Sequence, residues 1–323
     1  MVQVAIAVGN RDQGECYFIE TEKFIRMKGL KGIKCRKVRL LHHCYVFERM
    51  LHERIYIADT NSPHRSHARN AIESSGARAL SQDSLSFCLG DLENLEGPML
   101  RVKCREEGEN DLHLQIPGFW PNTLYPEIFG VPEKYVFALS LIIRLGQWKD
   151  EARHADTAAA LPLKDFLNRA KTVERYIKQL YRATRGPVAS STSLHPEFEP
   201  VLDDLLQAMC HALMIFFYRR IYNVDADMLQ AHVVGVRDCL VRLESTDFDT
   251  SAGSARLLWP EFNAACEAED AAVRTSFAIW FGNSKACSGI SYFGMAKSQI
   301  ERVWQARRSD NASHTTWIDL MEK

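Results

Sequence analysis

Hydrophobic residues recur at intervals of three and four along most of the chain, whereas strict alternation of apolar and polar residues is scarce. The first pattern is typical of amphipathic helices and the second of strands. The sequence therefore predicts an all-α protein, a single irregular multi-helix domain of about eight main helices spanning residues 1–323. The segments with helical spacing are 15–27, 36–55, 132–148, 163–181, 199–222, 226–243, 257–267, 271–281 and 294–308.

Two of these segments carry sharper expectations. The helix over 36–55 should turn an apolar stripe to the core and place His42, Arg49 and Glu53 on the opposite side. The helix over 199–222 is apolar nearly all round near its end, which predicts a buried central helix. The apolar stripe of the helix over 36–55 consists of Leu40, Leu41, Cys44, Phe47, Leu51 and Ile55.

Helical spacing fades between residues 58 and 130, where Gly and Pro are frequent. A structureless stretch of that length is unusual inside a domain. We therefore expect a loop-rich insertion that contains short helices, for instance over 84–92, and apolar plugs such as Phe119 and Trp120. A second linker, rich in Ser, is expected over 186–196.

Composition narrows the class of protein. The 323 residues include 40 Lys and Arg against 41 Asp and Glu, for a net charge of −1, which argues against a dedicated nucleic-acid binder. The nine cysteines include no C-x2-C pair, so we expect free thiols in a reducing compartment. Residues 1–9 are too short for a signal peptide, and no apolar run reaches the ~20 residues of a membrane span. We expect no membrane association.

The segment from Lys23 to Arg54 stands out from this balanced charge. It holds ten Lys or Arg residues against two acids, Glu48 and Glu53, for a net charge of +8. Such a segment is either a phosphate-binding face, a weak localisation signal or a solvated rim. The solvated rim is favoured, because no base-reading motif accompanies the charge.

Three groups contain residue types that bind metals. Adjacent side chains on a helix diverge by about 100°, so His42, His43 and Cys44 should not converge on one ion. The presence of His52 further along the same segment does not alter this expectation. The run from His64 to His67 lacks a third ligand. Asp203 and Asp204 invite comparison with prenyl-diphosphate enzymes, but no third acid follows. The positive end of a helix dipole explains this pair without a metal.

No motif for catalysis is found. The chain contains no GxGxxG, phosphate-cradling loop, GxSxG or HExxH. We therefore expect a non-enzymatic protein with no catalytic residue, no metal site and no cofactor.

Nine stretches together resemble the regulatory region of fungal zinc-cluster transcription factors, and most closely the subgroup that includes the arginine-metabolism activators. The Trp-Pro…Cys-Glu-Ala stretch and the Val-Trp-x-x-Arg-Arg…Trp stretch are its most specific marks. The nine stretches are 24–30, 36–45, 123–132, 216–222, 257–268, 280–281, 294–296, 303–308 and 317–321.

The resemblance implies a helical regulatory domain in the nucleus that works through co-regulator proteins, self-association or a small-molecule effector. It also implies a six-cysteine zinc cluster, and no cysteine here fits one. The chain thus looks like the C-terminal part of such a factor, without specific DNA binding of its own. Two alternatives remain open: an all-α enzyme of the isoprenoid type, and a nucleic-acid binder through Lys23 to Arg54.

The shared aromatic residues are expected to form the core: Trp259, Phe262, Trp280, Phe281 and Trp304. Trp259, Phe262, Ala265 and Cys266 should share one apolar side of a helix, with Glu261 and Glu267 off that side. By the same reasoning, loss of the Arg307 side chain should leave the fold intact.

Overall fold

The computed structural model describes residues 11–30, 32–53, 63–76, 94–154, 162–184, 199–245, 258–288, 291–309 and 316–318. Within these ranges the chain is all-α, as predicted, and an isolated bridge between Val102 and Phe119 is the one strand-like pairing. The helices are α2 (Arg11–Lys28), α3 (Arg36–Glu53), α4 (Pro63–Ser74), α5 (Glu96–Leu100), α6 (Arg105–Asn110), α7 (Tyr125–Phe129), α8 (Glu133–His154), α9 (Leu163–Ala183), α10 (Glu199–Tyr222), η2 (Ala226–Leu229), α11 (Gln230–Ser245), α12 (Leu258–Glu267), α13 (Ala271–Ser288) and α14 (Ser291–Ser309).

The long helices fall where the apolar spacing predicts them, and α10 has the predicted bounds. The predicted insertion contains more helix than its Gly and Pro content indicates, since α4, α5, α6 and α7 all lie within it. The expected helix over 84–92 and the expected linker over 186–196 lie outside the described residues. The helix count therefore exceeds the expected eight.

The chain divides into two compact units. Unit 1 comprises residues 1–124 and 143–161, and unit 2 comprises residues 125–142 and 162–323. Helix α8 contributes its first part to unit 2 and its second part to unit 1.

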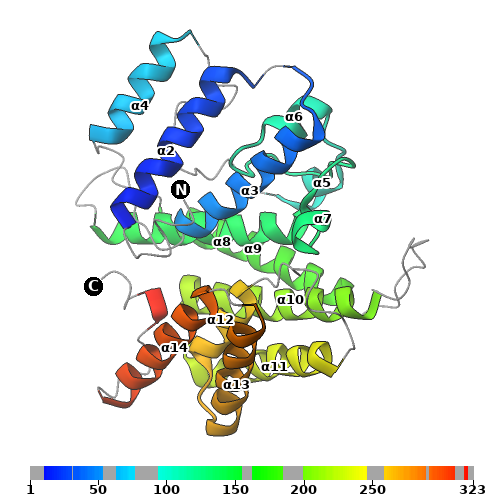
Figure 1. The fold of residues 1–323 in the computed structure, drawn as a ribbon, viewed down its shortest axis with the longest axis vertical. Helices are drawn as coiled ribbons and strands as arrows, with labels where there is room; N and C mark the ends of the chain where they lie inside the picture. The colour runs from blue at the N-terminus through cyan, green and yellow to red at the C-terminus, as the bar shows by residue number, and fades with distance from the viewer. Residues whose placement is uncertain are drawn as a thin grey trace. The chain divides into compact units, whose positions relative to one another are not determined.

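In unit 1, α2 packs against both α3 and α4 (Figure 1). Ile19 of α2 meets Ala68 and Ile72 of α4 in a small apolar cluster. Beside it, Arg65 donates from Nε to Oε1 of Glu15 at 2.7 Å, and both side chains are buried. A buried ion pair thus joins the same two helices that the apolar cluster joins.

In unit 2, α10 is the central helix, as predicted, and packs against α9, α11 and α12 (Figure 1). Residues 212–217 are all buried, which matches their apolar character. Among the described residues, α10 is the one helix long and apolar enough to cross a membrane, judged by length and composition alone. Its place at the centre of unit 2 accounts for that character equally well.

A glycine and a capping aspartate mark two of the helix ends. Gly29 follows α2 with φ of 89°, a left-handed conformation that favours glycine, and its N–H donates to the carbonyl of Arg26. Asp270 caps α13, because its Oδ1 accepts from the N–H of Val273 at 2.9 Å.

The aromatic core of unit 2 is largely as predicted. Trp259 is 4% exposed and meets the ring of Phe216 edge-on at 5.6 Å. Trp280 packs edge-on against Phe281 at 4.9 Å. Trp304 is only half-buried, and its indole N–H donates to the carbonyl of Ala265 at 2.9 Å.

Two acids of α12 lie off its apolar side, as predicted, and are nevertheless enclosed by the fold. These acids, Glu261 and Glu267, are both buried. Helix α12 is covered by α10, α11, α13 and α14, so nearly its whole circumference is enclosed. Glu267 is stabilised there by two arginines, because Nε of Arg219 and Nη2 of Arg307 lie 2.9 and 2.7 Å from its Oε2.

Candidate functional site

Exposed apolar side chains of unit 1 occur at the end of α2, in the α2–α3 connection and in the first turns of α3. Of the six residues concerned, Val38 is the least exposed at 38%, and we call the other five the α2–α3 surface: Phe24, Met27, Ile33, Leu40 and Leu41. Phe24 is 61% exposed, Ile33 77% and Leu41 64%. Isolated exposed apolar residues are ordinary, but five within 18 residues of sequence mark a candidate binding surface.

This finding corrects the predicted stripe of α3. Leu40 and Leu41 are exposed, whereas Arg49, placed on the outer side by the sequence, is 0% exposed. The helix instead buries Tyr45, Val46 and Met50, with Phe47 the correctly placed member of the stripe. Helix α3 is apolar on two sides, and the fold covers only one of them.

The stretch of sequence that carries the α2–α3 surface contains basic but no acidic residues. No Asp or Glu occurs between Glu22 and Glu48. Lys28 and Lys37 are exposed, and the Lys28 ammonium group lies 5.5 Å from the centre of the Phe24 ring. Apolar and cationic groups are therefore presented together.

Other basic residues of the segment from Lys23 to Arg54 are used inside unit 1. Arg26 is buried against Glu22, and Arg39 donates to the carbonyl of Asn122 at 2.9 Å. Lys34 donates to the carbonyl of Leu30 at 2.8 Å. Among the described residues of the segment, some basic side chains are thus bound within unit 1, while Lys28, Arg36 and Lys37 are exposed as a solvated rim requires.

A buried cluster centred on Glu22 joins α2 to α3. Arg26 donates to Oε1 of Glu22 from Nη2 at 2.6 Å, and the hydroxyl of Tyr45 donates to Oε2 at 2.8 Å. Nε2 of His113 lies 2.8 Å from Oε1. Burial opposes the charged carboxylate, yet His113, Arg26 and Arg49 outweigh it and hold the pKa of Glu22 well below its ordinary value.

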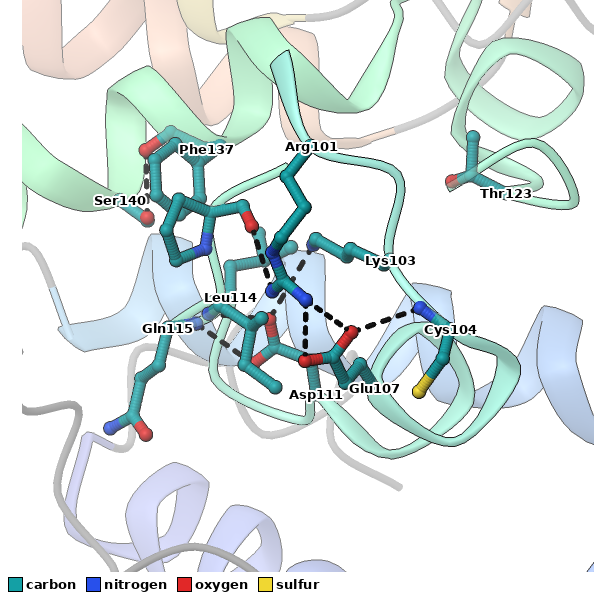
Figure 2. A network of polar contacts seen from close by, with 12 residues as sticks. Arg101, Lys103, Cys104, Glu107, Asp111, Leu114, Gln115, Thr123, Phe137 and Ser140 are labelled. Carbon is teal, nitrogen blue, oxygen red and sulfur yellow. Dashed lines mark hydrogen bonds and ion pairs between the residues drawn. The ribbon is translucent and has the colours of Figure 1, made fainter. Parts of the chain in front are cut away.

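Residues 94–124, which we call the strap, contain their own polar network (Figure 2). Arg101 donates from Nη1 to both carboxylate oxygens of Glu107 at 2.8 Å, and Glu107 accepts from the N–H of Cys104 at 2.9 Å. Asp111 accepts from the backbone N–H groups of Gln115 and Ile116 at 2.8 and 2.9 Å. These bonds give the short helices and turns of the strap a defined shape.

The strap holds one side of α3. Oε2 of Glu109 accepts from the N–H of Lys34 at 3.3 Å, and the Trp120 ring stacks on His43 with centroids 5.9 Å apart. Trp120 is buried as predicted, but Phe119 is exposed, so only one of the two expected plugs is correct. With this side of α3 covered, Leu40 and Leu41 remain exposed.

His43 lies in this contact with both of its ring nitrogens hydrogen-bonded. Its Nδ1 lies 2.8 Å from the carbonyl of Arg39, so Nδ1 carries the proton, and Nε2 accepts weakly from the N–H of Leu124 at 3.4 Å. Burial lowers the pKa of His43, and it also lowers that of His42. The neutral form of His43 therefore suits both bonds.

The structure does not bring the other metal-type residues together. His52 packs on the Phe18 ring at 5.0 Å, His64 lies 3.7 Å from Glu20, and Asp204 pairs with Arg242 at 2.6 Å. His67 and Asp203 are exposed. Across the described part of the chain, no group of three or more His, Cys, Asp and Glu residues could hold a metal ion.

The cysteines of the described residues are free thiols, as predicted. They are Cys16, Cys35, Cys44, Cys104, Cys210, Cys239 and Cys266. Burial raises the pKa of Cys210 to about 12 and that of Cys239 to about 11, which keeps both thiols protonated and unreactive.

Sequence reasoning missed the Glu22 cluster and a histidine pair, His211 and His232, whose Nδ1 atoms lie 3.0 Å apart. The i, i+4 spacing of Glu22 and Arg26 was a usable signal for that ion pair. His113 and the histidine pair are brought to their partners by the tertiary fold, and local spacing carries no sign of either.

Comparison with known proteins supplies the family. A family model described as the fungal specific transcription factor domain matches residues 1–323. No curated protein and no solved structure matches the chain. The match supports a role in transcription regulation and gives no support to an enzyme of the isoprenoid type. Because the match covers the full sequence, this chain belongs to the family of fungal specific transcription factor domains.

Proposed function

We propose that this chain is a non-enzymatic regulatory domain that acts in the nucleus by binding another protein through the α2–α3 surface. Family membership supports the regulatory role. The observation that carries the mode of action is the exposure of Phe24, Ile33 and Leu41 among lysines, with no acid between Glu22 and Glu48. Aromatic and aliphatic anchors surrounded by charge are typical of protein interfaces.

The partner proposed for this surface is an acidic amphipathic helix of a co-regulator. Its apolar side chains would cover Phe24, Met27 and Leu41, and its carboxylates would face Lys28 and Lys37. Opposite charge steers association and selects against basic partners. The buried Glu22 cluster supports this role, because it holds α2 and α3 in place before the partner arrives and so lowers the entropy lost on binding.

The experiment uses a fluorescent synthetic peptide with Leu and Phe at i, i+3 and i+4 positions and Glu elsewhere. Leu41→Asp should weaken binding at least tenfold, and Lys37→Glu should weaken it and reduce its salt dependence. Leu100→Asp is the matched control, because Leu100 is 85% exposed but lies in the strap. Equal loss in Leu41→Asp and Leu100→Asp, or no peptide binding, would contradict the proposal.

Self-association is distinguished by sedimentation. If the parent forms a dimer that Leu41→Asp dissolves, the surface joins two copies and the acidic partner is wrong. If the parent stays monomeric and binds the peptide, the co-regulator proposal stands. Sensing of a small molecule and membership of the arginine-metabolism subgroup remain predictions from the resemblance.

The basic residues of the segment from Lys23 to Arg54 also determine how strongly the chain can bind DNA. We expect at most weak, sequence-blind DNA binding, because Arg26, Lys34 and Arg39 are occupied within unit 1. Electrostatic contacts of that kind collapse as salt rises. A gel-shift series that finds a preferred site surviving about 200 mM salt would overturn this expectation.

A further inference from the structure

We propose that His211 and His232 form a two-histidine site for a divalent late transition metal ion. His211 lies on α10 and His232 on α11, and their Nδ1 atoms are 3.0 Å apart. This departs from the expectation of no metal site, which rested on local spacing alone. The two residues are 21 positions apart in sequence, and the packing of α10 on α11 brings them together.

The spacing of the two nitrogens fits one ion. Imidazole nitrogens bind such ions at about 2.0–2.1 Å, so two ligands at right angles lie about 2.8–3.0 Å apart and tetrahedral ligands about 3.3–3.4 Å apart. The observed 3.0 Å matches neighbouring positions of an octahedral or square-planar ion. Imidazole with that geometry favours Ni²⁺ or Cu²⁺ over Zn²⁺.

Neighbouring residues hold the two rings. Tyr181 of α9 meets His211 and His232 edge-on, with centroids 5.1 and 5.8 Å away. Gly235 of α11 leaves the space that the His211 ring fills, because a Cβ there would come within 2.4 Å of it. Three helices thus fix the rings before an ion binds, which raises affinity by reducing the entropy lost on binding.

Two cysteines of the same helices, Cys210 and Cys239, form hydrogen bonds with other residues. Cys210 accepts from the hydroxyl of Thr184 at 4.0 Å, and Cys239 accepts from Nη2 of Arg242 at 3.2 Å. Both histidines are only partly buried, which leaves the pair in contact with solvent. The expected site is therefore exchangeable, and it links α10 to α11 when filled.

An ordinary hydrogen bond is the competing explanation for the same distance. In that case one Nδ1 is protonated and donates, while the other accepts. The two explanations differ in one measurable respect. A pair that serves only as a hydrogen bond gives no stoichiometric metal binding. At the proposed site the ion displaces the proton shared by the two Nδ1 atoms, so one ion binds per chain and the melting temperature rises with the ion concentration.

The test is calorimetric titration of the full chain with Ni²⁺ and, separately, Zn²⁺. We expect one equivalent of Ni²⁺ to bind more tightly than Zn²⁺, and His232→Gln or His211→Gln to weaken it at least tenfold. Gly235→Ala should weaken it too, although both ligands remain, because the His211 ring must move. Circular dichroism establishes whether each variant is folded. If Gly235→Ala does not fold, the two glutamine variants provide the test.

The control is His64→Ala combined with His67→Ala. These residues lie at i and i+3 on α4 and form the obvious competing helical chelate. Unchanged Ni²⁺ affinity in this variant supports the proposal. Loss of binding here, retention of full affinity in both glutamine variants, or no saturable binding by the parent would each overturn it.

Discussion

Arg307 donates from Nη2 to Oε2 of Glu267 at 2.7 Å, and both side chains are almost fully buried. The bond ties α14 to α12, and Arg219 of α10 reaches the same carboxylate oxygen at 2.9 Å. One acid thus joins three helices of unit 2. The two arginines that contact Glu267 offset the free energy lost when its carboxylate is removed from water. Loss of either arginine leaves part of that cost uncompensated.

Arg307→Ala should therefore destabilise the protein, contrary to the sequence-based expectation that it would not. Breaking a buried ion pair costs about 3–5 kcal/mol. Arg308→Ala is the control, because Arg308 is the exposed neighbour on the same helix turn. Urea denaturation of the two variants and the parent measures the difference. Identical midpoints for the two variants would show that the pair contributes nothing.

Trp259→Ala should strongly destabilise unit 2. The indole is 4% exposed and packs edge-on against Phe216, so truncation leaves a large cavity. The expected loss is about 3–5 kcal/mol, a large part of a typical total of about 5–15 kcal/mol. Thermal melts measure it, with Trp259→Phe as the milder variant. If Trp259→Ala melts like the parent and loses only a partner, the indole is an interface anchor.

How far sequence reasoning reaches is clear from α10 and α3. In α10 the apolar residues surround the helix, so its central position follows from composition and needs no knowledge of its partners. In α3 apolar residues occur on two sides, and periodicity alone does not tell which side is covered. The strap and α2 decide it, and they do so through contacts such as Trp120 with His43.

Buried charges were the systematic failure, and the reason is physical. Helical spacing placed Arg49 opposite the apolar stripe of α3 and Glu261 and Glu267 off the apolar side of α12, yet the structure buries all three. Charged residues are seldom buried without partners, so these positions alone gave no reason to expect burial. Each partner found for Glu267 is more than 35 residues away in sequence. Local sequence patterns show that a charge would be costly to bury, but they do not show the distant arginine that offsets the cost. For the same reason they did not reveal the Glu22 cluster.

His43→Gln should change how stability depends on pH. Burial lowers the pKa of His43 below its ordinary value of 6.5, so the unfolded chain takes up the proton more readily than the folded chain. The stabilisation from neutral His43 is complete above pH 6.5 and is lost as pH falls from there towards the folded pKa. The free energy of unfolding of the parent should fall towards that of the variant by at most about 1.4 kcal/mol per pH unit.

Urea denaturation of the parent and His43→Gln between pH 8 and pH 5 provides the measurement. The difference in free energy should be constant from pH 8 to about pH 7, which serves as the internal control, and should narrow below pH 6.5. A difference that stays constant down to pH 5 would mean that His43 is not held neutral by its contact with the strap.

Glu22→Gln should destabilise unit 1 by about 3–5 kcal/mol, because it leaves the charges of Arg26 and Arg49 buried without their carboxylate. Glu20→Gln is the matched control on the same helix. Glu20 pairs with Lys23 at 2.9 Å near the surface, and such a pair contributes about 0–1 kcal/mol. Urea denaturation at neutral pH should therefore separate the two variants clearly.

Acid provides a second test of the Glu22 cluster. The pKa of Glu22 in the folded protein lies well below its ordinary value of 4.5, so its stabilisation is complete above that pH and is lost as the carboxylate takes up a proton at lower pH. The parent and Glu22→Gln should therefore converge in stability as pH falls below 4.5.

Peptide binding should weaken in Glu22→Gln even where the chain stays folded, since the cluster holds the α2–α3 surface. Unchanged binding by a folded Glu22→Gln would separate the cluster from the α2–α3 surface.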